Sequence, residues 1–152
     1  MTRAHPRLAR WQHHALLAVG ALLLATGLAW LALHYSVGAG AGELPHPLEA
    51  WLIRLHGLAA FAGLFMLGVL AGAHIPQGWR TSSRHRWAHQ RSSGVGLCAL
   101  GVVVVASGYL LYYFAPDALR PAIGWLHAGA GVAMTLLGMQ HRRRKSRPAG
   151  MD

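Results

Sequence analysis

Four long apolar stretches divide the chain, and polar and charged residues gather in the short segments between them. The stretches cover residues 15 to 35, 51 to 73, 94 to 115 and 122 to 140. A helix needs roughly 20 apolar residues to cross the hydrocarbon of a bilayer, and each stretch comes close to that length. The pattern predicts an all-α membrane protein: a bundle of four transmembrane helices that forms a single domain over residues 1–152, with a basic tail at 141–152.

The basic residues lie almost entirely on one side of these stretches. Of the 14 Lys and Arg residues, 12 precede the first stretch, connect the second to the third, or follow the fourth. Only Arg54 and Arg120 fall on the other side, with Glu43, Glu49 and Asp117. Segments rich in Lys and Arg stay in the cytoplasm, so we expect both termini to be cytoplasmic.

A net charge of +10 is also typical of nucleic-acid-binding proteins. Here the basic clusters flank apolar stretches, where they are attracted to anionic lipid. The Trp and His residues among the arginines of residues 77 to 93 suit the headgroup layer of a membrane. We therefore expect membrane lipid as a partner, and no nucleic acid.

The third apolar stretch offers little chemistry. It contains the single cysteine of the chain, Cys98, which excludes an internal disulfide framework and a zinc site built on several cysteines. Apart from this thiol, no ionisable side chain lies between Gly94 and Ser107. We expect Cys98 to pack in the core and the stretch to act as a scaffold.

Histidine is abundant, with 11 in 152 residues, and polar side chains at membrane depth are often functional. His127 and His141 stand at the two ends of the fourth stretch, 14 positions apart. On an α-helix this spacing leaves about 40° between them around the axis and about 21 Å along it. The two imidazoles therefore share one helix face at two depths.

Two further histidines match these depths. The second and fourth stretches start on the same side of the membrane, so His56 and His127 should lie at the same depth. His13 lies near the other side, at the depth of His141. Two levels with two facing imidazoles each are what two b-type haems with bis-histidine ligation need in a four-helix bundle. Three other histidines near the inner level leave a single haem open as an alternative: His14, His74 and His89.

Other chemistry fits these positions less well. Zinc needs three or four ligands that converge at one point, and a proton or cation path usually includes an acid within the membrane. Neither level has a carboxylate or a thiolate beside its histidines. A haem-free four-helix scaffold or transporter is the alternative in which the histidines only form hydrogen bonds between helices.

Gly20 and Gly27 follow His13 by 7 and 14 positions and so lie near its helix face. Small residues at this spacing allow close packing of membrane helices. They could equally make room for a flat cofactor beside His13. The sequence leaves both interpretations open.

Short motifs follow one another along the chain in a specific order. Arg10 precedes His13 by three positions, and a Thr26-Gly27 pair follows. The second stretch carries His56, then His74 directly before Ile75-Pro76. The third carries the pair Ser107-Gly108, and the fourth carries the run Ala128-Gly129-Ala130-Gly131 after His127. In this order they resemble the di-haem membrane cytochrome b superfamily: the cytochrome b subunits of formate dehydrogenases and Ni-Fe hydrogenases, and the bacterial cytochromes b561.

The resemblance implies how the ligands pair. In that superfamily the histidine of the second helix and the first histidine of the fourth bind the outer haem, which here implies His56 with His127. The histidine of the first helix and the second of the fourth bind the inner haem, which implies His13 with His141. The iron is then held by side chains of two different helices at each level.

Quinone chemistry near the inner haem is also implied. Formate dehydrogenase relatives carry an Asn-x-Gly-Gln-Lys stretch before the third helix, where this chain reads Trp87-Ala88-His89-Gln90-Arg91. Only Gln90 matches outright, and Arg91 is a conservative replacement. Quinone binding at Gln90 and Arg91 is therefore an open expectation.

The function that the resemblance implies is electron transport across a bacterial inner membrane. The chain would be the membrane-anchor cytochrome b subunit of an oxidoreductase, linking a periplasmic-side redox protein or catalytic subunit to the quinone pool. The alternative is a stand-alone cytochrome b561-type quinone oxidoreductase that acts on a small outer donor or acceptor, so the sequence does not decide whether the chain is itself an enzyme. We expect Arg54 or Arg120 to meet the propionates of the outer haem, because a guanidinium pairs well with a carboxylate.

Overall fold

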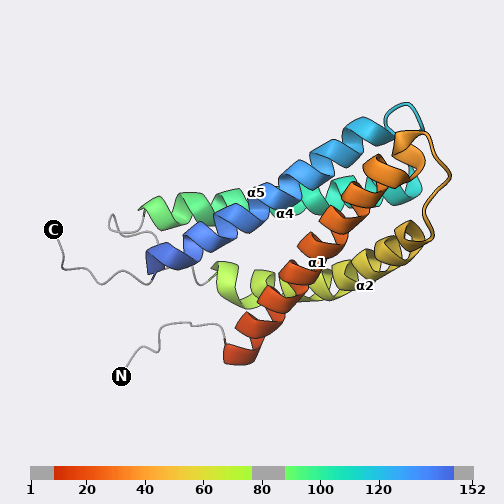
Figure 1. Ribbon diagram of the computed structural model, residues 1–152. Helices are drawn as coiled ribbons and strands as arrows, with labels where there is room; N and C mark the ends of the chain where they lie inside the picture. Colours follow the sequence, from red (N-terminus) through yellow and green to blue (C-terminus); the bar gives the residue numbers. More distant parts are fainter. Residues whose placement is uncertain (1–8, 77–87, 146–152) are drawn as a thin grey trace, which may run out of the picture. The chain divides into compact units, whose positions relative to one another are not determined.

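The computed structural model describes residues 9–76 and 88–145, and it is almost entirely helical over these ranges, with no strand in them (Figure 1). The helices are α1 (Arg10–Val37), α2 (Pro47–Val69), α4 (Ala88–Tyr113) and α5 (Arg120–Lys145). A short 3-10 helix, η1 (Ala39–Ala41), follows α1, and a π-helical turn, η2 (Leu70–His74), continues α2. Residues 77–87, which include most of the expected cytoplasmic loop, and the end of the basic tail lie outside the described residues.

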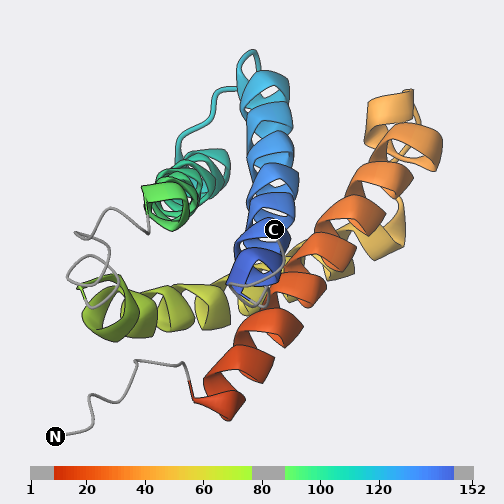
Figure 2. The same ribbon diagram turned by 90° about the vertical axis from the view of Figure 1, so that its left-hand side faces the viewer.

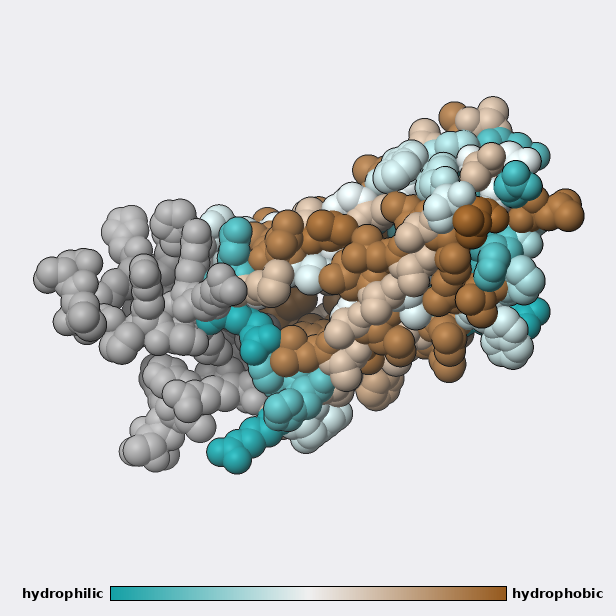
Figure 3. Space-filling model, in the orientation of Figure 1, coloured by the Kyte–Doolittle hydropathy of each residue, from teal (hydrophilic) through white to brown (hydrophobic). Residues whose placement is uncertain are grey.

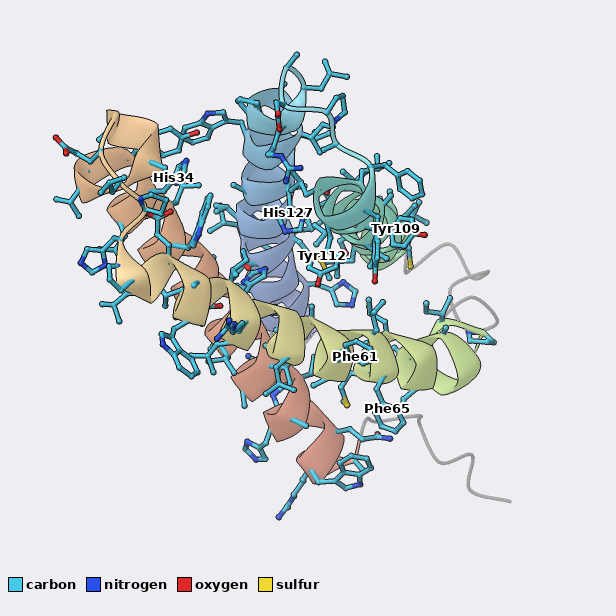
Figure 4. All side chains as sticks on the ribbon, turned by 90° about the vertical axis from the view of Figure 1, so that its right-hand side faces the viewer. His34, Phe61, Phe65, Tyr109, Tyr112 and His127 are labelled. Atoms are coloured by element: carbon cyan, nitrogen blue, oxygen red, sulfur yellow. The ribbon has the colours of Figure 1, made fainter. Side chains whose placement is uncertain are left out.

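Four helical spans are long and apolar enough to cross a membrane: Arg10–Ala41, Pro47–Gly72, Ser92–Tyr113 and Arg120–Arg142. They coincide with the four predicted stretches, which are thereby confirmed. Large apolar side chains cover their surfaces (Figure 3). Phe61 and Phe65 project outward from α2 with 78% and 69% of their surfaces exposed (Figure 4). Exposed apolar side chains over whole helices are the pattern of a multi-pass membrane protein, whose outer surface faces lipid.

The chain forms two compact units, Met1–Arg80 and Thr81–Asp152. Each unit contains one antiparallel helical hairpin: α1 packs against α2 in the first, and α4 packs against α5 in the second (Figure 2). Within a hairpin, the start of the first helix and the end of the second lie at the same end. A residue early in one helix therefore meets a residue late in its partner.

A partly buried contact between His34 and Glu49 closes the α1–α2 hairpin. We call it the latch: His34, Glu49 and Gly38, which lies against Glu49. The His34 Nδ1 lies 2.9 Å from Oε2 of Glu49, whose Oε1 accepts a hydrogen bond of 3.0 Å from the backbone N–H of His46, the N-cap of α2. A Cβ at Gly38 would overlap Glu49 Oε1. One carboxylate thus joins the end of α1 to the start of α2.

The α4–α5 hairpin is closed by an arginine. Arg120 donates hydrogen bonds of 3.0 Å to the carbonyls of Leu111 and Ala115, which satisfies backbone groups that a helix C-terminus leaves without partners. Pro121 follows as the second residue of α5, where a fixed φ suits the first helical turn. The expected short turn between the third and fourth stretches is therefore held by hydrogen bonds from Arg120, the first residue of α5.

Candidate functional site

His56 lies on α2 and faces α1 within the first hairpin. Its Nδ1 is 3.0 Å from Oγ1 of Thr26. A Cβ built on the next residue, Gly27, would come within 3.3 Å of the ring atom Cε1. The imidazole therefore rests on α1 where α1 has no side chain, with one nitrogen held by the neighbouring hydroxyl.

His127 repeats this arrangement in the second hairpin. It lies on the side of α5 that faces α4 (Figure 4). Its Nδ1 is 2.9 Å from Oγ of Ser107, and a Cβ on Gly108 would come within 3.2 Å of its Cε1. The two hairpins thus present an imidazole in the same way, on the sequences Ala-Thr-Gly (25–27) and Ala-Ser-Gly (106–108).

The two hairpins also have the same residue type one helical turn after each histidine. Ala59 follows His56 by three positions, and Ala130 follows His127 by three. Both alanines are buried, with 3% and 8% of their surfaces exposed. A small residue below each imidazole lets the two helices approach closely at the level where the ring is held.

A second imidazole is held deeper in the α4–α5 hairpin. Nδ1 of His141 lies 2.7 Å from Oγ of Ser93, and Ser93 is 7% exposed. Ser93 and Ser107 are 14 positions apart on α4, the same separation as His127 and His141 on the antiparallel α5. The prediction that His127 and His141 share one continuous helix is confirmed, and each has a hydroxyl partner at its own depth.

One expectation for the third stretch, the buried position of Cys98, was wrong. As part of the scaffold, α4 supplies Ser93 and Ser107 to the two histidines of α5. The signal for these serines in the sequence is a repeat that the prediction missed: Ser93-Gly94 and Ser107-Gly108 are 14 positions apart, as are His127 and His141. Cys98 is exposed instead of buried in a core. A free thiol behaves as a small apolar side chain, so its exposure on an apolar span costs little where such a span faces lipid.

The glycines expected beside His13 behave differently from one another. Gly27 faces His56 of the neighbouring helix, as described above, whereas a Cβ on Gly20 would meet no atom within 4 Å. His13 itself is half-buried on α1, and its ring lies edge-on to that of the exposed His14, with centroids 5.9 Å apart. The space at Gly27 is thus filled by an imidazole from α2, because α2 crosses α1 at that point.

The predicted ligand pairs each combine the two units. His13 and His56 belong to the first unit, and His127 and His141 belong to the second. The pairs His56 with His127 and His13 with His141 therefore stay predictions.

Arg54 and Arg120, the two arginines expected on the outer side, have different surroundings. Arg120 is held by the carbonyls at the end of α4 and lies 3.8 Å from Asp117. Arg54 is exposed, with its guanidinium carbon 5.3 Å from the centre of the Trp51 ring. Since Arg120 is engaged in closing its hairpin, Arg54 is the better candidate for binding a carboxylate.

Several residues named from the sequence cannot be placed as side chains. Gln90 and Arg91 belong to the first turn of α4 by their backbone, but their side chains lie outside the described residues, as do those of His74 and His89. Quinone binding at Gln90 and Arg91 stays a prediction, and so does the choice of His13 over His74 or His89.

The donor set fits a b-type haem. Each haem iron takes only two imidazoles from the protein, whereas zinc requires three or four converging ligands. A metal-bound histidine almost always has its other ring nitrogen hydrogen-bonded, which fixes the orientation of the ring. Three of the four predicted ligands have Nδ1 placed in this way: His56, His127 and His141.

Comparisons with protein-family models, curated proteins and solved structures find no match to this chain. What the protein does is therefore inferred from its own residues and their contacts.

Proposed function

We propose that this protein carries electrons across a membrane through two b-type haems, each held by two histidines. The supporting observation is the repeated arrangement in the two hairpins, where a hydroxyl and a glycine hold the imidazoles of His56 and His127. In the proposal these two imidazoles bind an outer haem. His141, held by Ser93, binds an inner haem together with His13.

The chain's own contribution is to set the two depths and to orient the ligands. His127 and His141 lie on one helix, which separates the two levels by about 21 Å along its axis. A haem bound by two of these histidines would supply one-electron chemistry, and the two imidazoles would leave no iron position for oxygen. Hydroxyls on α1 and α4 hold the rings, and Arg54 is the side chain proposed to meet a propionate of the outer haem.

The proposed setting is a bacterial inner membrane with both termini in the cytoplasm, because 12 of the 14 basic residues flank the spans on one side. His56 and His127 then lie toward the periplasm. A periplasmic redox protein or catalytic subunit would exchange electrons at that level, and quinone would do so near the inner level. The preferred role is the membrane-anchor cytochrome b subunit of an oxidoreductase.

The test is a reduced-minus-oxidised spectrum of the purified chain, with haem counted per chain, for the wild type and four alanine variants. We expect two haems in the wild type. His56→Ala and His127→Ala each lose the same haem, and His13→Ala and His141→Ala each lose the other, because removal of one axial ligand weakens the site that both share. His14→Ala is the matched control: it removes the imidazole next to His13 and keeps both haems.

A wild-type chain without a b-type spectrum would refute the proposal and favour a haem-free scaffold or transporter. Loss of the inner haem in His74→Ala or His89→Ala, with retention in His13→Ala, would reassign the inner ligand. Quinone-linked turnover by the chain alone with a small-molecule donor would favour a stand-alone quinone oxidoreductase. Turnover only after a companion protein is added would favour the subunit role.

A further inference from the structure

We propose that Thr26 and Ser107 are positioning residues that fix the tautomer of His56 and His127, so that Nε2 is the coordinating nitrogen and the ring is a stronger ligand for ferric iron. The inference deepens the proposed function and rests on it for the role of the iron. It concerns two hydroxyls whose contacts are set within each hairpin.

The direction of each hydrogen bond follows from counting protons. Oγ1 of Thr26 lies 2.7 Å from the carbonyl oxygen of Leu22, and Oγ of Ser107 lies 2.6 Å from that of Val103. A carbonyl can only accept, and a hydroxyl has one proton to donate. Each hydroxyl therefore donates to its own helix and accepts from the imidazole, which makes Nδ1–H of the histidine the donor.

This direction determines the tautomer. A neutral imidazole carries one N–H, so a proton on Nδ1 leaves the lone pair on Nε2. The neutral form is the relevant one, because a charged side chain within the membrane is costly. His56 and His127 thus present the same nitrogen to a ligand.

The surroundings keep the hydroxyls in this role. Thr26 is 5% exposed and Ser107 is 3% exposed, so neither oxygen has ready access to an alternative partner such as lipid-interface water. Gly27 and Gly108 lie beneath Cε1 of the two rings and allow each ring to approach its hydroxyl. The contacts are equivalent in the two hairpins although the partners are 30 and 20 positions apart in the sequence.

The same contacts act on the electron density of the ring. In the chain Nδ1–H to hydroxyl to carbonyl, each hydrogen bond polarises the next. An accepting group at Nδ1 raises the basicity of a ligating imidazole, and a more basic ligand favours ferric over ferrous iron. Both hydroxyls should therefore lower the midpoint potential of the haem that His56 and His127 share.

The first test needs no haem. In the full chain, labelled with ¹⁵N at histidine and purified without haem in nanodiscs, ¹⁵N NMR should show His56 and His127 in the neutral Nδ1–H form. Loss of each signal in His56→Gln and His127→Gln assigns it. The Nε2–H form at both positions would overturn the inference whether or not the chain binds haem.

The second test is a redox titration of the haem-loaded chain. Thr26→Val and Ser107→Ala should each raise the potential of the same haem. The expected rise in its ferrous-to-ferric ratio at a fixed ambient potential is on the order of tenfold, or about 59 mV for one electron. Thr26→Ser and Ser107→Thr should keep the wild-type value, since they keep the hydroxyl.

Two matched controls separate this effect from general damage. Thr135→Val on α5 removes a hydroxyl that donates to its own helix at Gly131, and it should leave both potentials unchanged. Ser93→Ala removes the partner of His141 and should leave the outer haem unchanged.

The outcomes distinguish the two claims. Loss of the outer haem in Thr26→Val with retention in Thr26→Ser would also support the need for the hydroxyl. Unchanged or lower potentials in both Thr26→Val and Ser107→Ala would overturn the inference while the two-haem function stands. Shifts in two different haems would overturn the pairing of His56 with His127, and a wild-type chain without haem would overturn the proposed function itself.

Discussion

At the scale of single residues, the imidazole of His56 meets two neighbours on α1 that contribute in different ways. Thr26 supplies a polar contact of 3.0 Å to Nδ1, and Gly27 supplies space beneath Cε1. Ser107 and Gly108 do the same for His127. A ring orientation that depends on both a hydrogen bond and an absent side chain is sensitive to the addition of a single methyl group.

The alanine variants of these glycines test that sensitivity. In Gly27→Ala and Gly108→Ala the new Cβ would lie 3.3 and 3.2 Å from Cε1, so the ring must move by a few tenths of an ångström. We expect a smaller fraction of chains to keep the outer haem, and a changed low-spin electron paramagnetic resonance signal in those that do. Stability should change little, because alanine's gain in helix propensity, up to about 1 kcal/mol, offsets the crowding.

Gly20→Ala is the control on the same helix, since its Cβ would meet no atom within 4 Å. It should leave both haems and their spectra as in the wild type. An unchanged outer-haem spectrum in both Gly27→Ala and Gly108→Ala would show that the glycines do not shape the ligand geometry.

At the scale of elements, the unit of construction is a helical hairpin that a charged side chain closes at the connection between its two helices. Glu49 performs this task between α1 and α2, and Arg120 performs it between α4 and α5. His56, His127 and His141 lie on the second helix of their hairpins, and their hydroxyl partners lie on the first. The hairpin connections therefore set the register in which hydroxyl and imidazole meet.

The latch gives a stability prediction. Glu49→Ala removes the acceptor of His34 Nδ1 and of the His46 backbone N–H, and a partly buried donor left without its partner is costly. We expect a lower midpoint of thermal unfolding, followed by circular dichroism in detergent. Gly38→Ala should act in the same direction by on the order of 1–3 kcal/mol, because its Cβ would overlap the Glu49 carboxylate.

Glu43→Ala is the comparison for the latch, because it removes an exposed carboxylate from the same connection. It should keep the wild-type midpoint. Equal midpoints for Glu49→Ala and Glu43→Ala would mean that the contact of Glu49 with His34 does not hold the hairpin closed.

At the scale of the whole molecule, charge and hydropathy decide how the protein sits in a membrane. Four apolar spans are present, and the chain has 14 basic residues against 4 acidic ones. Twelve of the 14 basic residues flank the spans on the side that contains both termini. This asymmetry predicts the orientation on which the assignment of outer and inner levels depends.

Cysteine labelling tests the orientation. In a Cys98→Ser background, Glu43→Cys and Asp117→Cys should react with a membrane-impermeant maleimide in intact spheroplasts, because both positions are exposed in the outer connections. Arg142→Cys should react only after the membrane is permeabilised. The reverse pattern would invert the topology and exchange the outer and inner levels.

The sequence by itself determined the four spans and the common face of His127 and His141, and it named the histidines that are predicted to serve as ligands. These features are local: hydropathy over about 20 residues identifies a span, and helical periodicity relates two positions on one helix. For the same reason the helix boundaries were close to those observed, and the sharing of α5 by both histidines was correct.

The tertiary structure alone decided which side chains meet each imidazole. Thr26 and Gly27 contact His56 instead of standing beside His13, and Ser93 serves His141 across 48 positions of sequence. Such contacts depend on where two helices cross. The crossing is set by the small residues at that point and by the side chains that close each hairpin, Glu49 in the first and Arg120 in the second. Periodicity along one helix carries no information about the register of its neighbour, so the hydroxyl partners of the histidines could be found only in the folded hairpins.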